Sequence, residues 1–198
     1  MAEVKRPMPR LFLIRHGETE WSLNGRHTGR TDIPLTARGV GLIKDRAQNA
    51  VGPGKLLDPD NMCHAPPHSV TEEVREWDYG DYEGLTSKEI HKTNPGWDIF
   101  RDGCPGGESV EQMTKRVDDL IAKVREIHRL YLEEGVGRRD VLICSHGHFS
   151  RVLVSRWFGF ELCLGTHFNI EPAGISMLGY NHNSLKEPSL TGLNLYTL

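Results

Sequence analysis

Two short stretches share one pattern: LFLIRHG at residues 11–17 and VLICSHG at residues 141–147. Each is an uninterrupted apolar run that ends in a histidine followed by a glycine. Such a run is typical of a strand that is buried on both faces, as in a parallel sheet. Because helical patterns lie between the two runs, the sequence predicts an α/β fold. We expect a three-layer sandwich, with a mostly parallel sheet and helices on both of its faces.

Helix signals lie between and beyond these two strands. The strongest begins at the capping pattern Ser109-x-x-Gln112 and carries apolar residues at steps of three and four as far as Tyr131, before Gly135. This spacing places one apolar stripe on a helix and leaves the charged residues on its solvent face. Further helices are predicted at residues 36–51, 86–92 and 147–158, and further strands at residues 74–77 and 173–180.

The chain has 198 residues, a length that fits one domain. We expect a single domain over residues 8–198, preceded by a disordered N-terminus at residues 1–7. Residues 18–34 predict a functional loop, because long connections in compact domains usually serve binding or catalysis. Residues 52–70 are broken by prolines and show no periodicity, so we expect an irregular junction there.

Composition excludes several classes of protein. Apolar residues make up 37% of the chain and charged residues 26%, which is too apolar for a disordered protein. No run approaches the roughly 18 apolar residues of a membrane helix. The net charge of −3 gives no indication of a nucleic-acid partner. The N-terminus lacks the apolar core of a secretory signal, and the four cysteines form no CxxC pair, so we expect a reduced, cytoplasmic chain. Nothing in the sequence predicts whether the protein is a monomer or an oligomer.

The two strand ends at His16 and His146 carry the candidate chemistry. Ligands of open α/β sheets bind at the carboxyl ends of strands, so neighbouring strands would place both imidazoles in one crevice. Arg15 adds a forked cation that is suited to phosphate. A neutral imidazole is a nucleophile toward phosphorus, and a second one stabilises the developing charge. Glu76, among aromatic residues in a glycine-rich turn, is the best candidate for a general acid, for which we expect a raised pKa.

Other interpretations of these residues stay open at this point. A single His-Gly pair at a strand end is more often a structural turn, but two such ends with the same chemistry favour a site. The pair His146-x-His148 matches part of a metal site, yet no further ligands are evident. We therefore expect no metal and no other cofactor. Residues 97–101 either line a substrate pocket or plug a loop.

Longer stretches resemble the histidine phosphatase superfamily, also called the phosphoglycerate mutase-like family. They are LIRHGETEWSLNGRHTGRTDIPLT at residues 13–36, REWDYGDYEGLT at 75–86, GESVEQMTKRV at 107–117 and VLICSHGHFSRVL at 141–153, in the order that the family uses. Within the superfamily the chain looks most similar to the fungal sedoheptulose-1,7-bisphosphatases. WDIFRDGCPGGES at residues 97–109 and AGISMLGYNHNSLKEPSL at residues 173–190 are further matching stretches.

The resemblance implies roles for named residues. His16 would be the phosphorylated nucleophile, with Arg15 and His146 in the phosphate pocket, and Glu76 would be the proton donor and later the base. The positions implied for further phosphate or substrate contacts are Ser22, Thr28, Gly29, Gly147 and His148. Mutases of the family have Asn where this chain has His148, and this departure favours a phosphatase over a mutase. Histidine and arginine supply the positive charge, so the resemblance implies no metal.

A second departure concerns an arginine. The family has a strand that ends in a Ser-x-x-x-Arg-Ala-x-x-Thr-like motif, followed by a helix, and its arginine binds phosphate. This chain passes from DPDNMCH at residues 58–64 straight to APPHSVTEEVREW at residues 65–77. We therefore expect one strand and one helix to be missing. We interpret the junction near Cys63–Pro67 as the mark of a shortened chain, arising by alternative splicing or an error in a gene model.

Two functions from different classes follow. The first is an enzyme, a cofactor-independent phosphatase that hydrolyses phosphorylated sugars, above all sedoheptulose-1,7-bisphosphate, through a phosphohistidine. Losing one donor aimed at transition-state charge costs about 10²–10³ in rate, so the missing arginine would impair it. The second is a catalytically inactive remnant that binds phosphorylated ligands or protein partners. A phosphoglycerate mutase is a third, less favoured interpretation.

Overall fold

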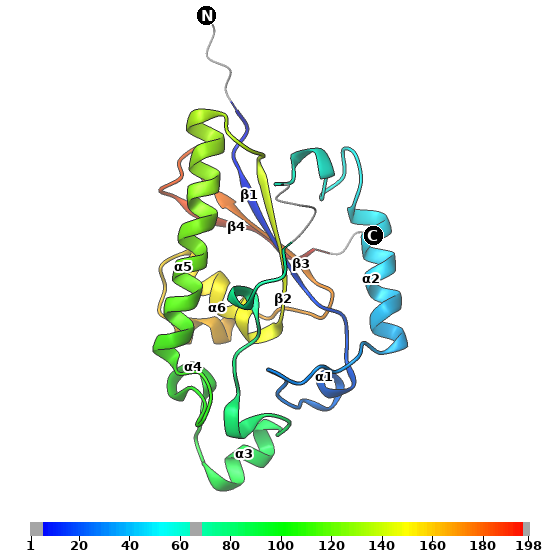
Figure 1. Ribbon diagram of the computed structural model, residues 1–198, viewed down its shortest axis with the longest axis vertical. Coiled ribbons are helices and arrows are strands. Elements are labelled where there is room, and N and C mark those ends of the chain that lie inside the picture. The colour runs from blue at the N-terminus through cyan, green and yellow to red at the C-terminus, as the bar shows by residue number, and fades with distance from the viewer. Residues whose placement is uncertain (1–5, 64–68, 196–198) are drawn as a thin grey trace, which may run out of the picture.

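The structure is a computed structural model that describes residues 6–63 and 69–195. A central sheet separates two layers of helices, with α5 and α6 on one side and α2 on the other (Figure 1). Four strands form the sheet in the order β2-β1-β3-β4. Their bounds are β1 Arg10–Arg15, β2 Asp140–Ser145, β3 Ile175–Tyr180 and β4 Pro188–Leu195. The predicted α/β fold with helices on both faces is confirmed.

The sheet is mixed, whereas the sequence predicted a mostly parallel one. Only β1 and β2 pair in parallel, and the pairs β1–β3 and β3–β4 are antiparallel. β3 runs antiparallel because it starts beside the end of β1, where the Ala173 N–H donates to the His16 carbonyl at 2.9 Å. β4 then follows through a tight turn in which His182 and Asn183 have positive φ. Turns of this kind need no helical crossover between strands.

Four of the six α-helices in the described residues follow the predicted signals closely, whereas α1 in the predicted loop at residues 18–34 and α4 were not predicted. Their bounds are α1 Glu20–Asn24, α2 Ala37–Ala50, α3 Ser87–Thr93, α4 Ile99–Asp102, α5 Val110–Arg129 and α6 Gly147–Trp157. Thr86 and Ser109 each accept a backbone N–H three residues ahead and so form the two predicted capping boxes. Short 3₁₀ turns lie at Pro59–Asn61, Glu72–Val74, Gly80–Tyr82 and Leu162–His167, and a π turn extends α5 at Leu130–Glu134.

The predicted strand at residues 74–77 is wrong. Residues 72–74 form a 3₁₀ turn, and the following residues are extended without joining the sheet. Their carbonyl groups bind arginine side chains instead of another strand: Arg116 takes those of Glu73 and Arg75 at 3.0 Å each. Among the described residues between α2 and α5, none belongs to a strand of the sheet, and Met62 makes an isolated parallel bridge to Asp140 at the start of β2. The disordered N-terminus predicted at residues 1–7 and the irregular junction at residues 52–70 lie partly outside the described residues.

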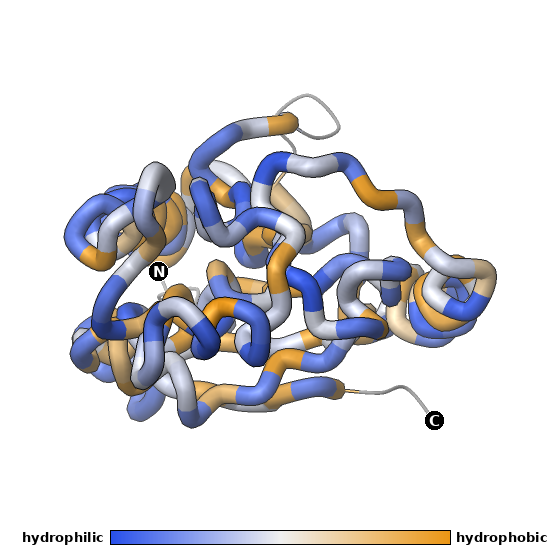
Figure 2. The backbone as a smooth tube through the Cα atoms, turned by 90° about the horizontal axis from the view of Figure 1, so that it is seen from below, coloured by the Kyte–Doolittle hydropathy of each residue, from blue (hydrophilic) through white to orange (hydrophobic). Residues whose placement is uncertain are grey.

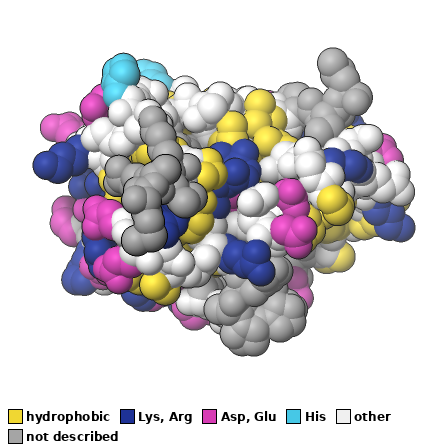
Figure 3. Space-filling model, turned by 90° about the horizontal axis from the view of Figure 1, so that it is seen from above, with side chains coloured by type: hydrophobic (Ala, Val, Ile, Leu, Met, Phe, Trp, Pro, Cys, Tyr) yellow, Lys and Arg dark blue, Asp and Glu magenta, His cyan; other side chains and the backbone are white. Residues whose placement is uncertain are grey.

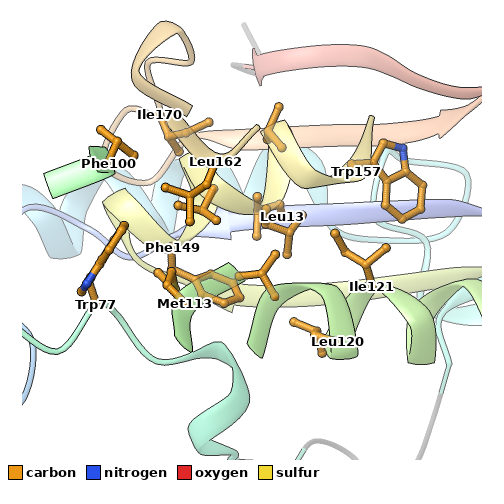
Figure 4. Packing of buried hydrophobic residues seen from close by; sticks show 14 of the residues in the cluster. Leu13, Trp77, Phe100, Met113, Leu120, Ile121, Phe149, Trp157, Leu162 and Ile170 are labelled. Atoms are coloured by element: carbon orange, nitrogen blue, oxygen red, sulfur yellow. The ribbon is translucent and has the colours of Figure 1, made fainter. Parts of the chain in front are cut away.

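The two faces of the sheet bury different cores. Leu11 and Leu13 of β1 belong to the larger core cluster with residues of α5 and α6, and Figure 4 shows Leu13 in this core together with Phe149 and Met113. Phe12 points to the opposite face, in a smaller cluster with Ala50 at the end of α2. Alternation of side chains along a strand therefore serves both layers, which is why the run of residues 11–14 is apolar throughout. At the end of the molecule opposite α1 and α3, basic and acidic side chains lie interspersed (Figure 3).

His128 is a fully buried polar residue of this core. It lies on α5 with 0% of its surface exposed, and its Nδ1 is 2.8 Å from the Tyr180 hydroxyl of β3. Trp157 of α6 packs against both rings. Burial lowers the pKa of His128 to about 4, so the ring is neutral in the folded protein at neutral pH.

We predict that His128 makes the protein lose stability in mild acid. Its pKa is lower in the folded chain than the ordinary 6.5, so its contribution is complete above pH 6.5 and declines as the pH falls toward 4. Between pH 7 and 5 the loss from this residue is about 2 kcal/mol. Urea unfolding of the wild type and of His128→Gln at both pH values checks this. Equal pH dependence of the two proteins would contradict it, whatever their difference in stability at pH 7.

Candidate active site

The parallel pairing of β1 and β2 brings the two predicted histidines together. The register places Arg15 opposite Ser145, so both strands end at the same level, at the end of the molecule that Figure 2 shows. The His16 N–H donates to the Ser145 carbonyl at 2.9 Å. The imidazole centroids of His16 and His146 lie 5.0 Å apart, with the rings inclined by 61°. His146 is also the residue that precedes α6.

His16 has a defined tautomer. Its Nδ1 is 2.7 Å from the carbonyl oxygen of Gly17, which only accepts, so Nδ1 carries the proton and Nε2 keeps the lone pair. Burial lowers the pKa of His16, and the neighbouring charges of His146 and Arg15 lower it further, although the hydrogen bond to the Gly17 carbonyl raises it. A neutral ring with a free Nε2 is the form that attacks an electrophile.

Glu76 lies at the N-terminus of α6. Its Oε1 accepts the backbone N–H groups of Phe149 at 2.7 Å and Trp77 at 3.0 Å, and its Oε2 accepts that of His148 at 3.0 Å. The carboxylate therefore satisfies two N–H groups in the first turn of the helix, where the helix dipole also favours a negative charge.

The predicted raised pKa of Glu76 is wrong for the free protein. Burial raises it, but electrostatic interaction with the imidazoles of His148 and His146 and hydrogen bonds from the Phe149 and Trp77 N–H groups together outweigh burial, so the pKa is lowered from its ordinary 4.5. Sequence spacing could not indicate this, because the opposing groups come from α6, some seventy residues away along the chain.

Arg15 completes the centre. Its Nη1 donates to the Ile170 carbonyl at 2.7 Å, and its Nε is buried without a hydrogen-bond partner among the described residues. Gly147 leaves room for the guanidinium, since a Cβ there would lie 3.3 Å from the Arg15 Cζ. A side chain at residue 147 would press on the cation, which accounts for the glycine after the second histidine.

One cavity of about 940 Å³ joins these groups. All of the predicted site residues line it: Arg15, His16, Ser22, Thr28, Gly29, Glu76, His146, Gly147 and His148. Ser22 and Gly29 use their polar groups within the protein. The Ser22 hydroxyl closes the cap of α1 with Thr19, and the Gly29 N–H donates to the Glu83 carboxylate at 2.9 Å. Residues 97–101 line the cavity as well, in agreement with the first of the two interpretations given above for this stretch.

The lining residues that were not predicted include His27, Tyr79 and Arg151. His27 donates from Nδ1 to the Leu85 carbonyl at 2.7 Å, and its ring stacks on that of His148 with centroids 5.9 Å apart. The Tyr79 hydroxyl lies 2.7 Å from Nδ1 of His148. Arg151 of α6 is a second guanidinium in the cavity. A signal for Arg151 existed, because a helix that begins at Gly147 places residues 148 and 151 on one face.

All five arginines between His16 and Glu76 have protein partners. Arg26 donates to the Gly84 carbonyl at 2.5 Å, Arg30 to Asp78 and Glu72, Arg38 to Glu18, Arg46 to the Pro172 carbonyl, and Arg75 to the Glu76 carbonyl and the Glu108 carboxylate. Arg26 lines the cavity from this stretch, and Arg101 and Arg151 line it from beyond Glu76. No cluster of three metal-ligating side chains occurs among the residues that the structure describes. No described helix is long and apolar enough to cross a bilayer.

The model of the histidine phosphatase superfamily (branch 1) matches residues 11–49 and 62–191. The chain belongs to the histidine phosphatase superfamily. An acid phosphatase of Mycobacterium tuberculosis is 39% identical over 197 residues, covering 93% of this chain and 92% of that protein. The sedoheptulose 1,7-bisphosphatase of Saccharomyces cerevisiae is 29% identical, covering 92% of this chain and 91% of that protein. The chain is a phosphoric monoester hydrolase by family.

Solved structures agree with this assignment. An open reading frame of Mycobacterium tuberculosis superposes with a TM-score of 0.78 at 34% identity, over 96% of this chain and 99% of that one. A phosphoserine phosphatase of Entamoeba histolytica, solved with 3-phosphoglyceric acid, has a TM-score of 0.69 at 26% identity, over 95% and 98%.

The comparisons also bear on the missing segment. The alignment with the yeast enzyme spans 249 residues, more than the 198 of this chain. The yeast protein therefore contains sequence that this chain lacks. The family match is interrupted between residues 49 and 62, just before the junction expected at Cys63–Pro67, most of which lies outside the described residues.

We predict that the Glu76 carboxyl is ionised in the free enzyme and is driven toward protonation when an anion fills the cavity. In the free protein its pKa lies below 4.5, and a phosphate dianion beside it raises that pKa by repulsion. Carbon-13 NMR of labelled glutamate, with Glu76→Gln for assignment, measures both states. A Glu76 signal that titrates at the same pH with and without orthophosphate would contradict the prediction.

Proposed function

We propose that this histidine phosphatase hydrolyses phosphorylated sugars, with sedoheptulose-1,7-bisphosphate as the leading substrate, through a phosphohistidine at His16. The observation that carries the proposal is the pair of imidazoles 5.0 Å apart beside an arginine and a buried carboxylate. The nucleophile, the cations and the proton donor thus meet at one end of two paired strands.

The proposed reaction has two steps. Nε2 of His16 attacks phosphorus while His146 and Arg15 stabilise the charge on the phosphoryl oxygens. Glu76, whose pKa rises when the substrate dianion lies beside it, protonates the leaving alcohol. Ionised again, it then takes a proton from water, which hydrolyses the phosphohistidine. No metal is required, because fixed cations supply the positive charge.

Two features favour a bisphosphate of a polyol. Arg15 and Arg151 share the cavity, and the Nε of Arg151 donates to the Phe168 carbonyl at 2.7 Å, which directs its guanidinium. Burial together with the charge of Arg15 lowers the pKa of Arg151. The two cations therefore repel one another, and a substrate with two phosphate groups would neutralise both of them. His27 and His148 form a neutral wall beside them, since burial lowers the pKa of His148 to about 4. Neutral imidazoles bind hydroxyl groups rather than a further phosphate.

A protein that binds phosphorylated ligands without turnover is the second candidate. The absence of the family's pocket arginine favours it, because one lost donor costs about 10²–10³ in rate. The two candidates share ligand chemistry and differ in turnover, so one measurement separates them.

We expect His16→Ala to abolish phosphate release from sugar bisphosphates, because no other group in the cavity has the position of the nucleophile. Phosphate release is measured over a panel of sugar mono- and bisphosphates. His182→Ala is the matched control, since this exposed histidine on the β3–β4 turn pairs only with Glu187 in the described structure. Full activity of His16→Ala would exclude the mechanism, and binding of the panel by an inactive wild type would favour the second candidate.

We expect Arg151→Met to raise the KM for a bisphosphate by about 10- to 100-fold, the worth of one charge-assisted contact. The KM for the monophosphate of the same carbon chain should change little. Arg156→Met is the control, because Arg156 lies on the same helix and pairs with Asp118 of α5. Equal effects on both substrates would contradict a contact to a second phosphate.

A further inference from the structure

Glu76 is carried by a segment that has no regular structure of its own. The residues from the 3₁₀ turn at Glu72–Val74 to the turn at Gly80–Tyr82 belong to no helix or strand. The backbone polar groups of such a segment need partners from other elements, and the Trp77 and Tyr79 side chains anchor it in the core. The position of the Glu76 carboxylate therefore depends on contacts made by neighbouring elements.

An ion pair lies behind this segment. Arg116 of α5 is 14% exposed and Glu108 is 4% exposed at their side chains. The Arg116 Nε and Nη2 each donate to the Glu108 carboxylate at 2.8 Å, which is a forked, two-bond pairing. Paired guanidinium and carboxylate groups of this kind are stiff, because two bonds fix the plane of both groups. Glu108 also accepts from Arg75 at 3.3 Å.

The remaining donors of Arg116 bind the backbone beside Glu76. Nη1 donates to the carbonyls of Glu73 and Arg75 at 3.0 Å each, and Nη2 approaches the Glu76 carbonyl at 3.5 Å. The Arg116 guanidinium also lies over the ring of Phe149, 5.3 Å from its centroid. Phe149 is the residue whose N–H donates to the Glu76 carboxylate. Arg116 therefore contacts both the residue that donates this hydrogen bond and the residue that accepts it.

Glu108 holds the other half of the segment. Its backbone carbonyl accepts the Trp77 indole N–H at 2.8 Å, and its N–H donates to the Asp78 carbonyl at 2.9 Å. The residues before and after Glu76 are thus tied to one buried ion pair, while the Glu76 side chain is tied to α6.

We propose that Arg116, fixed by Glu108, is a positioning residue for the general acid: it holds the backbone that carries Glu76 so that the carboxylate faces the leaving group. This inference rests on the proposed function and deepens it. Arg116 lies behind the segment and does not line the reaction cavity, so it acts through Glu76 and not on substrate.

The test compares two leaving groups. An alkyl phosphate needs a proton on the departing oxygen, whereas p-nitrophenyl phosphate releases an anion that leaves without one. We expect Arg116→Ala to lower kcat/KM for the sugar phosphate by about 10- to 100-fold, the cost of a misplaced catalytic group. The value for p-nitrophenyl phosphate should change little, because kcat/KM reports the transfer to His16. A general loss of folded protein would lower both values equally.

Two controls sharpen this result. Arg156→Ala removes the forked pair with Asp118 between α6 and α5 and should leave the ratio of the two substrates unchanged. Millimolar guanidinium should restore sugar phosphate turnover of Arg116→Ala, since a cavity of about 300 Å³ lined by Arg75, Asp78, Gly107, Glu108, Gln112 and Arg116 admits it. If Arg116→Ala does not fold, Arg116→Lys and Glu108→Gln are measured by the same ratio.

A readout without turnover separates this inference from the proposed function. When the Glu76 carboxylate loses its backbone N–H partners, its carboxyl titrates at higher pH, which carbon-13 NMR of Arg116→Ala detects. An inactive wild type overturns the proposed function alone, and the NMR shift still decides the role of Arg116. An unchanged substrate ratio, with an unchanged Glu76 titration, overturns the inference in an active enzyme.

Discussion

The in-register parallel pairing of β1 with β2 is the constraint on which the site depends. It ends both strands at one level and so places His16 and His146 with ring centroids 5.0 Å apart. A shift of one residue would turn each side chain to the opposite face of the sheet. The register is fixed by the buried alternation of β1, where Leu11 and Leu13 serve one core and Phe12 the other. The hydrophobic core and the reaction centre are therefore set by the same four residues of apolar sequence.

What could be predicted from the sequence follows from signals that are local. Apolar runs predicted β1 and β2. Capping pairs such as Ser109 with Gln112 predicted where helices start, because their side chains bind the free backbone N–H groups of the first turn. β4 had no such signal. A bulge near Gly192 breaks its pairing with β3, so the usual alternation of strand residues is lost. The segment before Glu76 resembled a strand in composition, but the Arg116 side chain of α5 binds backbone carbonyls that a strand would need for pairing.

The same distinction applies to the site. The identities of His16, His146 and Glu76 were visible in the sequence, because each follows or interrupts a recognisable pattern. The protonation states of these residues were not visible in the sequence. The tautomer of His16 depends on the Gly17 carbonyl, and the lowered pKa of Glu76 depends on His148, His146 and the N–H groups of Phe149 and Trp77. The second guanidinium was sought upstream of Glu76, where the family pattern has it, whereas the cavity receives Arg151 from α6.

These contacts hold the candidate site although no described residue between α2 and Glu76 belongs to a strand of the sheet. The groups that hold the Glu76 segment lie beside it or downstream: His148 and Phe149 bind its carboxylate, and Arg116 binds its backbone. A segment whose position is set by later elements does not need the strand that would precede it. β2 is an edge strand in the described sheet, and its Leu142 is 42% exposed. Exposed apolar strand edges lower stability and solubility. The weak point of the described fold therefore lies at this edge of the sheet and not at the segment that carries Glu76.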